Sequence, residues 1–299
     1  MAQILNPSIS DRVVAVLRAS RPPGWCFGPI LFGIGVIQSR IFPRSKSELL
    51  TTVLQLGSLS FPLCAIVFGM NDVYDYDSDL LNPRKAQGSL EGAILNPVYH
   101  RDVRIVAWVS TALILGCSLL AQQRDNFIAT ACLVCLGWQY SATPLRLKEV
   151  PILDSISNGL IVLLGSFVGF SHGGASVFDA PRKQYTMALV CSGVHALGAV
   201  VDVDADVAAG QRTIATYLGR RSTVIFAASA YAIGVASEGW RSVFGAYLVG
   251  GLVLTIAPVL NLDWTHQAFK LVVYWTVVMS MIWFGEQGRN FVARIQKRP

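Results

Sequence analysis

The stretch LCAIVFGMNDVYDYDSD, residues 63–79, runs from an apolar segment directly into a dense group of acids. Four aspartates lie within the nine residues 71–79. Carboxylates next to hydrocarbon are costly unless something positive occupies the site between them. The stretch therefore predicts that a membrane helix ends in a site for a cation.

The composition places the whole chain in a membrane. Of its 299 residues, 53% are hydrophobic and 14% are charged, whereas a soluble domain carries about 25% charged residues. The net charge of +6 comes from Lys and Arg residues scattered through the loops, which is typical of the flanks of membrane helices. We therefore expect an integral membrane protein whose partner is the lipid bilayer. Neither a nucleic acid partner nor an obligatory protein partner is indicated.

The apolar runs predict an all-α fold, a polytopic bundle of about nine membrane-spanning helices around a central apolar cavity capped by the polar loops. No linker or shift in composition divides residues 1–299, so we expect one transmembrane domain. Residues 1–20 carry apolar side chains at helical spacing with Arg12 and Arg18 opposite, which predicts an N-terminal helix lying at the interface. The expected spans are 24–38, 49–70, 105–122, 126–140, 153–170, 185–201, 222–236, 242–260 and 270–285.

Three polar loops follow the second, fourth and sixth expected spans. An odd–even count therefore puts all three on the same face as the N-terminus. Slightly more than half of the Lys and Arg residues lie on that face, so the loops are predicted to be cytoplasmic. They read NDVYDYDSDLLNPRK (71–85), YSATPLRLKEVP (140–151) and DVDADVAAGQRT (202–213).

In two of these loops the acids recur at intervals of three and four residues, which would place them on one face of a helix. Asp77 and Asp204 do not fit these intervals and would lie off that face. Either group alone is explained as a solvated acidic loop, but two matched groups at span ends on one face favour a shared cation site. Oxygen ligands with room for water suit Mg²⁺, which also binds substrate phosphates. The candidate Mg²⁺ ligands are Asn71, Asp72, Asp75, Asp79, Asp202 and Asp206.

Cations accompany the acids in the same three loops. Each could be an ordinary interfacial anchor, but their placement beside a predicted Mg²⁺ site favours recognition of a diphosphate, for which Arg offers a fork and Lys a point charge. A diphosphate at the mouth of an apolar cavity fits an amphiphile with a hydrocarbon tail, such as an isoprenyl diphosphate. The candidate diphosphate-binding cations are Arg84, Lys85, Arg146, Lys148 and Arg212.

Three motifs carry a resemblance to the UbiA superfamily of intramembrane prenyltransferases. NDVYDYDSD (71–79) resembles NDxxDxxxD, DVDADVAAGQRT (202–213) resembles DxxxD followed by AGxRT, and YSATPLRLK (140–148) resembles YSxxPxRxK. The segments DLLNPRK (79–85) and PILDSISNGL (151–160) are further similar to the branch that contains lycopene elongases. Fungal UbiA-type terpene cyclases also look similar.

The resemblance implies an Mg²⁺-dependent enzyme that ionises a long isoprenyl diphosphate, for which we favour geranylgeranyl diphosphate. Mg²⁺ and basic residues stabilise the charge that builds on the leaving diphosphate, and a dry cavity protects the carbocation from water. Asp204 stands where the family often has Glu, a departure of little consequence. The residues that the resemblance makes catalytic are Asp72, Asp75, Asp202, Asp206 and Tyr140, with Tyr140 near the reacting carbon.

What captures the carbocation is open. We find no spare polar handle for a hydroxybenzoate, which leaves an alkene, and we favour one on the substrate's own tail, giving cyclisation to a terpene. The alternative is prenyl transfer to a second molecule, a carotenoid or quinone-type acceptor. An ion-coupled transporter is the remote alternative, since transporters place such charges near the bilayer midplane, whereas these lie at span ends.

His195 lies seven residues before Asp202, two helical turns deeper on the same face. A neutral imidazole there could contact the substrate and take the final proton from a carbocation. The alternative is a histidine that only joins two helices by hydrogen bonds, as intramembrane polar residues commonly do.

Overall fold

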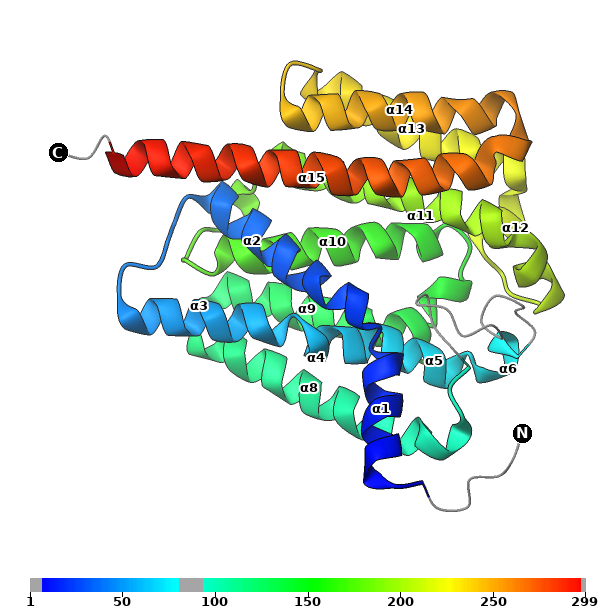
Figure 1. Cartoon of the computed structure of the whole chain (residues 1–299), viewed down its shortest axis with the longest axis horizontal. Helices are drawn as coiled ribbons and strands as arrows, with labels where there is room; N and C mark the ends of the chain where they lie inside the picture. Colours follow the sequence, from blue (N-terminus) through cyan, green and yellow to red (C-terminus); the bar gives the residue numbers. More distant parts are fainter. Residues whose placement is uncertain (1–6, 81–93, 297–299) are drawn as a thin grey trace.

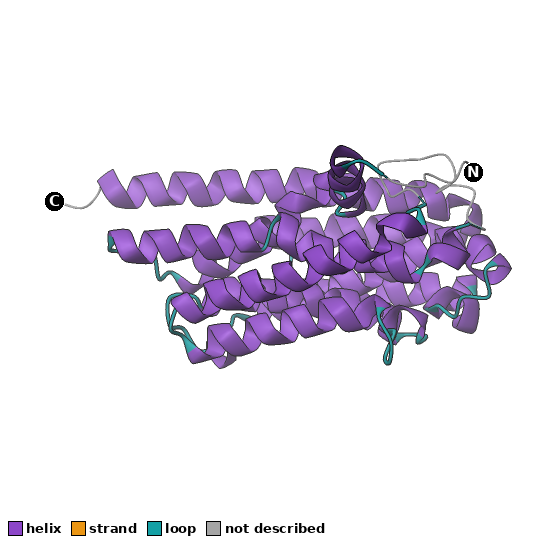
Figure 2. Cartoon of the chain, turned by 90° about the horizontal axis from the view of Figure 1, so that it is seen from below, coloured by secondary structure: helices purple, strands orange, loops and turns teal. Residues whose placement is uncertain are grey.

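The computed structural model describes residues 7–80 and 94–296, with side chains described up to Asn290 and at Ala293. These residues are largely helical and contain no β-strand (Figure 2). Nine long helical segments within them coincide with the nine expected spans, so the all-α prediction is confirmed. They are α2 (Phe27–Ser39), α3 to α5 (Lys46–Ser58, Phe61–Cys64 and Met70–Tyr74), α8 (His100–Leu120), α9 (Arg124–Ser141), α10 (Leu153–Ser171), α11 (Arg182–Ala208), α13 (Arg220–Glu238), α14 (Val243–Leu260) and α15 (Thr265–Gln296).

Six segments of the described chain are long and apolar enough to cross a membrane by length and composition alone. The other three of the nine helical segments are too short or too polar to meet these limits. α2 has 13 residues, about 20 Å of helix against roughly 30 Å of hydrocarbon, while α9 and α13 begin with charged residues. The six segments are Lys46–Tyr74, Pro97–Leu120, Leu153–Ser171, Arg182–Ala208, Val243–Leu260 and Leu262–Asn290.

α10 lies in the middle of the bundle, where it packs against α2, α9 and α11 (Figure 1). α11 in turn packs against α13 and α15, and α14 contacts both of these. Close approach of α2 and α10 depends on glycine. A Cβ on Gly35 would lie 2.1 Å from the carbonyl oxygen of Ser166, and one on Gly169 would lie 2.0 Å from that of Phe32. The two helix backbones therefore touch, as small residues allow in membrane helices.

The segment that carries the first acids is locally irregular. A π-helical turn, η2 (Ala65–Gly69), joins α4 to α5, and the short helix α6 (Tyr76–Asp79) follows a break at Asp75. Such turns are rare and recur at functional sites. The Asp75 N–H donates to the Asn71 carbonyl at 2.9 Å, and the Asp79 N–H donates to the Asp75 carbonyl at 2.7 Å. The predicted four-residue spacing of the acids therefore survives the break.

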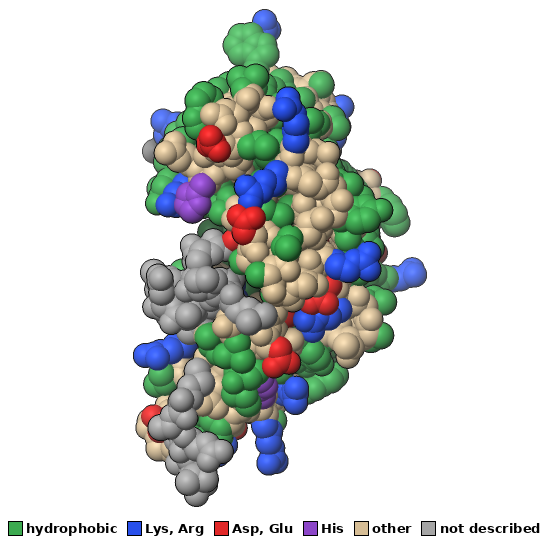
Figure 3. Space-filling model, turned by 90° about the vertical axis from the view of Figure 1, so that its right-hand side faces the viewer, with side chains coloured by type: hydrophobic (Ala, Val, Ile, Leu, Met, Phe, Trp, Pro, Cys, Tyr) green, Lys and Arg blue, Asp and Glu red, His purple; other side chains and the backbone are tan. Residues whose placement is uncertain are grey.

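The three motif loops lie at the end of the bundle that also carries α1 (Ile9–Ala19), at the right of Figure 1. α5 and α6, the loop after α9, and α12 (Ile214–Leu218) after α11 meet there. α1 runs across the other helices, with Arg12 Nη1 3.1 Å from Asp102 Oδ1 of α8. Its place at the membrane interface stays a prediction. Figure 3 faces this end and shows acidic and basic side chains gathered on it.

Candidate active site

Asp72 is buried at the end of α5, with 1% of its surface exposed. Arg21 Nη2 donates to Asp72 Oδ1 at 3.0 Å and to Asn71 Oδ1 at 3.3 Å. The Arg21 guanidinium also lies over the Phe68 ring, 4.8 Å from its centre, which is a cation–π contact. Arg21 has a φ of 51° immediately before Pro22, so the turn that follows α1 directs this cation toward the acids.

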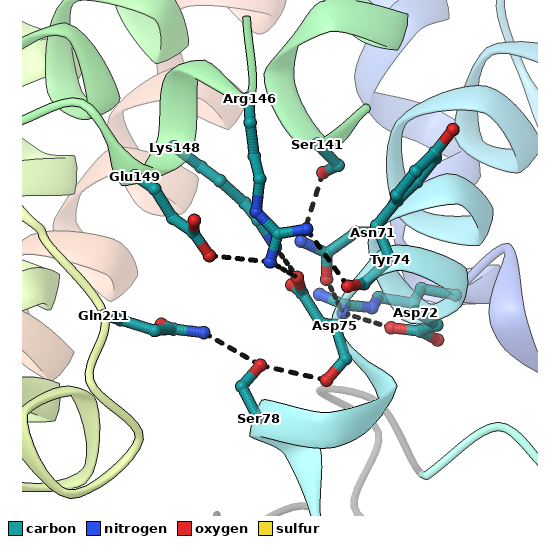
Figure 4. Close-up of polar contacts among 11 residues, drawn as sticks. Asn71, Asp72, Tyr74, Asp75, Ser78, Ser141, Arg146, Lys148, Glu149 and Gln211 are labelled. Atoms are coloured by element: carbon teal, nitrogen blue, oxygen red, sulfur yellow. Dashed lines mark hydrogen bonds and ion pairs between the residues drawn. The ribbon is translucent and has the colours of Figure 1, made fainter. Parts of the chain in front are cut away.

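Asp75, also buried, contacts both predicted cations of the loop after α9 (Figure 4). Arg146 Nη2 lies 3.2 Å from Asp75 Oδ1, and Lys148 Nζ forms an ion pair with the same oxygen. Arg146 also donates through Nη1 to the Tyr74 carbonyl at 3.1 Å and through Nη2 to Glu149 Oε1 at 2.6 Å. Two of the three predicted motifs are thus joined directly by side chains.

Lys148 is the most buried cation of this loop, with 8% of its surface exposed. Burial lowers the pKa of its ammonium group to about 8, while the carboxylates of Glu149, Asp72 and Asp206 act to raise it. The group therefore remains mostly protonated at pH 7. A desolvated ammonium among oxygen atoms attracts an anion more strongly than an exposed one does, because the local dielectric is low.

The second acid motif reaches the first in a small shared pocket. Asp206, near the end of α11, lines a cavity of about 120 Å³ together with Asp75 and Asp79. Gln211 Nε2 donates to Ser78 Oγ at 2.9 Å, which ties the two acidic loops to each other (Figure 4). Carboxylates from both halves of the chain therefore face one pocket.

Other predicted acids lie around this pocket rather than in its wall. Asp202 is half-buried one helical turn before Asp206. Asp77 and Asp204 are exposed, in keeping with their place off the predicted helix face. Arg220 Nη2 lies 2.5 Å from Asp204 Oδ1, so Asp204 is held on the outside of α11.

Of the predicted cations outside the loop after α9, only Arg212 lies within the described residues. Arg212 is exposed, and no hydrogen bond or ion pair links it to another residue that the structure describes. Arg84 and Lys85 lie outside the described residues. Arg21, in contrast, pairs with Asp72. Reasoning from the sequence does not predict this contact, because RPPGW (21–25) indicates only the end of a helix.

The donor set around the pocket fits Mg²⁺. Every predicted ligand binds through oxygen, which is the ligand atom that Mg²⁺ prefers. Among the described residues, no three His, Cys, Asp or Glu side chains form a cluster ready to hold a metal ion. Mg²⁺ usually takes only one or two carboxylates from the protein and completes its shell with water and substrate phosphates. The pocket therefore fits an ion that binds together with a diphosphate.

Tyr140 and His195, which are 55 residues apart in the sequence, meet in a polar cluster deeper in the bundle. Tyr140 Oη lies 3.1 Å from His195 Nε2 and accepts from Asn158 Nδ2 at 2.9 Å. His195 Nδ1 lies 3.1 Å from Ser155 Oγ. Which partner donates in the two contacts of the His195 ring depends on the imidazole tautomer. His195 thus joins helices by hydrogen bonds, as one of its two interpretations expected, and does so through Tyr140.

Asp154 is a buried carboxylate that reasoning from the sequence missed. Its Oδ2 accepts the Ile214 N–H at 2.8 Å, at the first residue of α12. The adjacent Thr213 donates through Oγ1 to Asp206 Oδ2 at 3.2 Å. Asp154 therefore anchors Ile214, and the residue before it, Thr213, binds an acid of the shared pocket. Its signal in the sequence is weak, a single acid in the first turn of an apolar helix.

Comparisons with known proteins agree with this geometry. The family model of the UbiA prenyltransferase family matches residues 26–285. A lycopene elongase/hydratase from Haloferax volcanii is 30% identical over 288 residues, covering 92% of this chain and 91% of that protein. Another from Haloarcula japonica is 31% identical over 281 residues, covering 90% and 91%. A solved UbiA homologue from Archaeoglobus fulgidus bound to GPP and Mg²⁺ has a TM-score of 0.67 at 20% identity, covering 91% of this chain and 98% of that one.

The family match spans most of the chain, and the two elongase/hydratases match it over nearly their whole length. The likeness to the solved structure shows that the helical bundle is of the same fold. The chain thus belongs to the UbiA prenyltransferase family, as a multi-pass integral membrane enzyme of the prenyltransferase type.

Proposed function

We propose that this enzyme transfers a prenyl group from an isoprenyl diphosphate to an alkene carbon of a carotenoid-type acceptor. The sequence alone favours cyclisation of the substrate's own tail. The two lycopene elongase/hydratases that match nearly the whole chain support the intermolecular alternative better. The observation that carries the proposal is the pocket that Asp75, Asp79 and Asp206 share, with the cations of the loop after α9 at its edge.

The diphosphate is proposed to bind where these acids and cations meet. Bound there with the substrate, Mg²⁺ would neutralise charge on the leaving diphosphate. Lys148 and Arg146 now pair with Asp75, and Arg21 pairs with Asp72, so each is placed to exchange a carboxylate for a phosphate oxygen. Arg84, Lys85 and Arg212 remain proposed members of this set. The proposed ligands of the ion are Asn71, Asp72, Asp75, Asp79, Asp202 and Asp206.

The reaction conserves atoms and charge in three bond changes. When the allylic C–O bond breaks, its electron pair leaves with the diphosphate, and the surrounding cations stabilise the charge. The π-electron pair of the acceptor alkene then forms the new C–C bond, which moves the positive charge onto the acceptor. Loss of a proton from the adjacent carbon restores an alkene.

We assign the final proton to the imidazole of His195. The ring contacts Tyr140 Oη through Nε2 and Ser155 Oγ through Nδ1. Both Tyr140 and His195 keep part of their surface exposed, which leaves them accessible to a bound chain. The cluster is a polar group that lies deeper along α11 than the acids, where the hydrocarbon part of an amphiphile would extend.

Product analysis with purified protein in lipid vesicles tests the proposal. Dimethylallyl, geranyl and geranylgeranyl diphosphate would each be supplied with Mg²⁺, with and without lycopene. We expect diphosphate release and a prenylated carotenoid only when lycopene is present. A cyclic hydrocarbon formed from the donor alone would overturn transfer and restore cyclisation.

A further inference from the structure

A second recess lies at the opposite end of the bundle from the acids. It is a groove of about 660 Å³ between the end of α2, the start of α11 and the C-terminal part of α15. Lys183, at its edge, precedes Asp202 by 19 residues of α11, about 28 Å along the helix. This distance is close to the thickness of the hydrocarbon layer, roughly 30 Å. The groove and the acids therefore face opposite surfaces of the bilayer.

Apolar side chains form much of the wall of this groove. Ile37 and Phe42 contribute from α2 and the residues that follow it, and Trp283 and Phe284 contribute from α15. The Trp283 and Phe284 rings lie 5.1 Å apart in an edge-to-face arrangement. Trp283 lies seven residues before the end of the spanning segment Leu262–Asn290, about 10 Å along the helix, and Trp is enriched near the membrane interface. The groove thus offers hydrocarbon-like surface at the level where lipid chains join their headgroups.

The charged residues of the groove have one sign. Of the described residues that line it, Arg40 and Lys183 are cations and none is an acid. Both are exposed, and neither forms an ion pair with another described residue. Gln184 Nε2 donates to Gln38 Oε1 at 2.7 Å, which fixes the Gln38 side chain beside them. The rim is therefore suited to an anion rather than to a zwitterion, whose ammonium the two cations would repel.

The backbone of Arg40 supports a role for its side chain. Arg40 ends α2 with a φ of 59°, a conformation that favours glycine because a Cβ is unfavourable there. Backbone geometry alone therefore does not explain an arginine at this position. An arginine that binds an anion at the helix end does explain it, since its fork matches two phosphate oxygens.

We propose that this groove binds an anionic phospholipid of the bilayer. Its phosphate lies between Arg40 and Lys183, and an acyl chain lies along Phe42 and Trp283. α15 packs mainly against α11 and α14, so a lipid held here also fills the space between α15 and the end of α2. This site is independent of the proposed prenyl transfer.

Native mass spectrometry of the purified protein tests the proposal. The protein would be offered phosphatidylglycerol and phosphatidylcholine in equal amounts, and we expect phosphatidylglycerol to be retained in preference. The Arg40→Gln/Lys183→Gln double variant should retain it roughly tenfold less, because two attractions to an anionic headgroup are lost. The Arg44→Gln/Arg241→Gln double variant is the matched control. It removes two exposed cations at the same end of the bundle but outside the groove, and it should retain the lipid as the wild type does.

Equal loss in the control would show that bulk surface charge, not the groove, attracts the lipid, and would overturn the proposal. Unchanged retention in the groove variant would overturn it as well. A second measurement locates the lipid without altering either cation. Phosphatidylglycerol brominated on its acyl chains should quench the tryptophan fluorescence of the wild type more than that of Trp283→Phe. Equal quenching of the two proteins would contradict the proposed position of the chain.

Discussion

Arg21 and Asp72 form the contact on which the first acid motif depends most closely. The Asp72 side chain is 2% exposed and that of Arg21 is 21% exposed, so water screens their attraction only in part. Arg21 also reaches Asn71 with the same nitrogen. A buried carboxylate is costly without a cation beside it, and this cation is already placed where a diphosphate would bind. Arg21 therefore serves both the fold and the proposed chemistry.

Replacing Arg21 should reduce both stability and turnover. Arg21→Ala removes a charged partner from a buried carboxylate, so the free energy of unfolding should fall by about 1–3 kcal/mol. Turnover of the isoprenyl diphosphate at low concentration should fall on the order of tenfold or more. Arg21→Lys should recover part of both losses, because it keeps the charge but not the planar fork. Thermal unfolding and diphosphate release measure the two effects.

Arg18→Ala is the matched control for this prediction. Arg18 lies three residues earlier, on the exposed face of α1, and its removal should change neither quantity. Wild-type stability and turnover in Arg21→Ala would show that this cation is incidental to the site.

The contact between α2 and α10 shows how single elements set the positions of the motif loops. α10 begins beside Asp154, which anchors α12, and ends where Gly169 meets α2. A shift of α10 would therefore move the loop that positions Asp206. Because the two backbones touch through Gly35 and Gly169, the helix pair has no room for an added methyl group at these positions.

A pair of glycine substitutions on α2 tests this packing. A Cβ on Gly35 would meet the Ser166 carbonyl at 2.1 Å, whereas one on Gly33 would meet nothing within 4 Å. Gly35→Ala should therefore destabilise the protein by about 1–3 kcal/mol through overpacking. Gly33→Ala should be neutral or stabilising by up to about 1 kcal/mol, since alanine favours a helix. Thermal unfolding in detergent compares the two, and equal stabilities would contradict the close packing of α2 on α10.

Reasoning from the sequence predicts the elements better than it predicts the partners within the site. The apolar runs mark the nine long helical segments, six of which are long and apolar enough to cross a membrane. The motif spacing selects Asp75, Asp79 and Asp206, which share one pocket. It cannot select Arg21 or Asp154, because each depends on a contact between distant elements that leaves no periodic pattern. For Arg212 the sequence predicts too much. It lies in a motif, but it forms no hydrogen bond or ion pair with the described acids. Orientation in the membrane remains a prediction.

At the scale of the whole molecule, the two halves of the chain contribute to a single site. Asp75 and Asp79 come from the first half, Asp206 comes from the second, and Gln211 bridges to Ser78 between them. Mg²⁺ bound together with one diphosphate would offset the charge of carboxylates from both halves at once. If so, losing either acid motif should remove most of what the other contributes to binding, because they share one ligand.

A double-mutant cycle on ligand binding tests this claim most directly. Calorimetry would measure the affinity of a non-ionising thio analogue of geranyl diphosphate, with Mg²⁺, for the wild type, Asp75→Asn, Asp206→Asn and the double variant. Asp204→Asn is the control, since Asp204 is exposed and pairs with Arg220. We predict that each single change weakens binding on the order of tenfold, and that the double change weakens it less than the two effects combined, by about 0.5–1 kcal/mol. The control should bind as the wild type does. Strictly additive losses, or an equal loss in Asp204→Asn, would contradict a single site built from both halves.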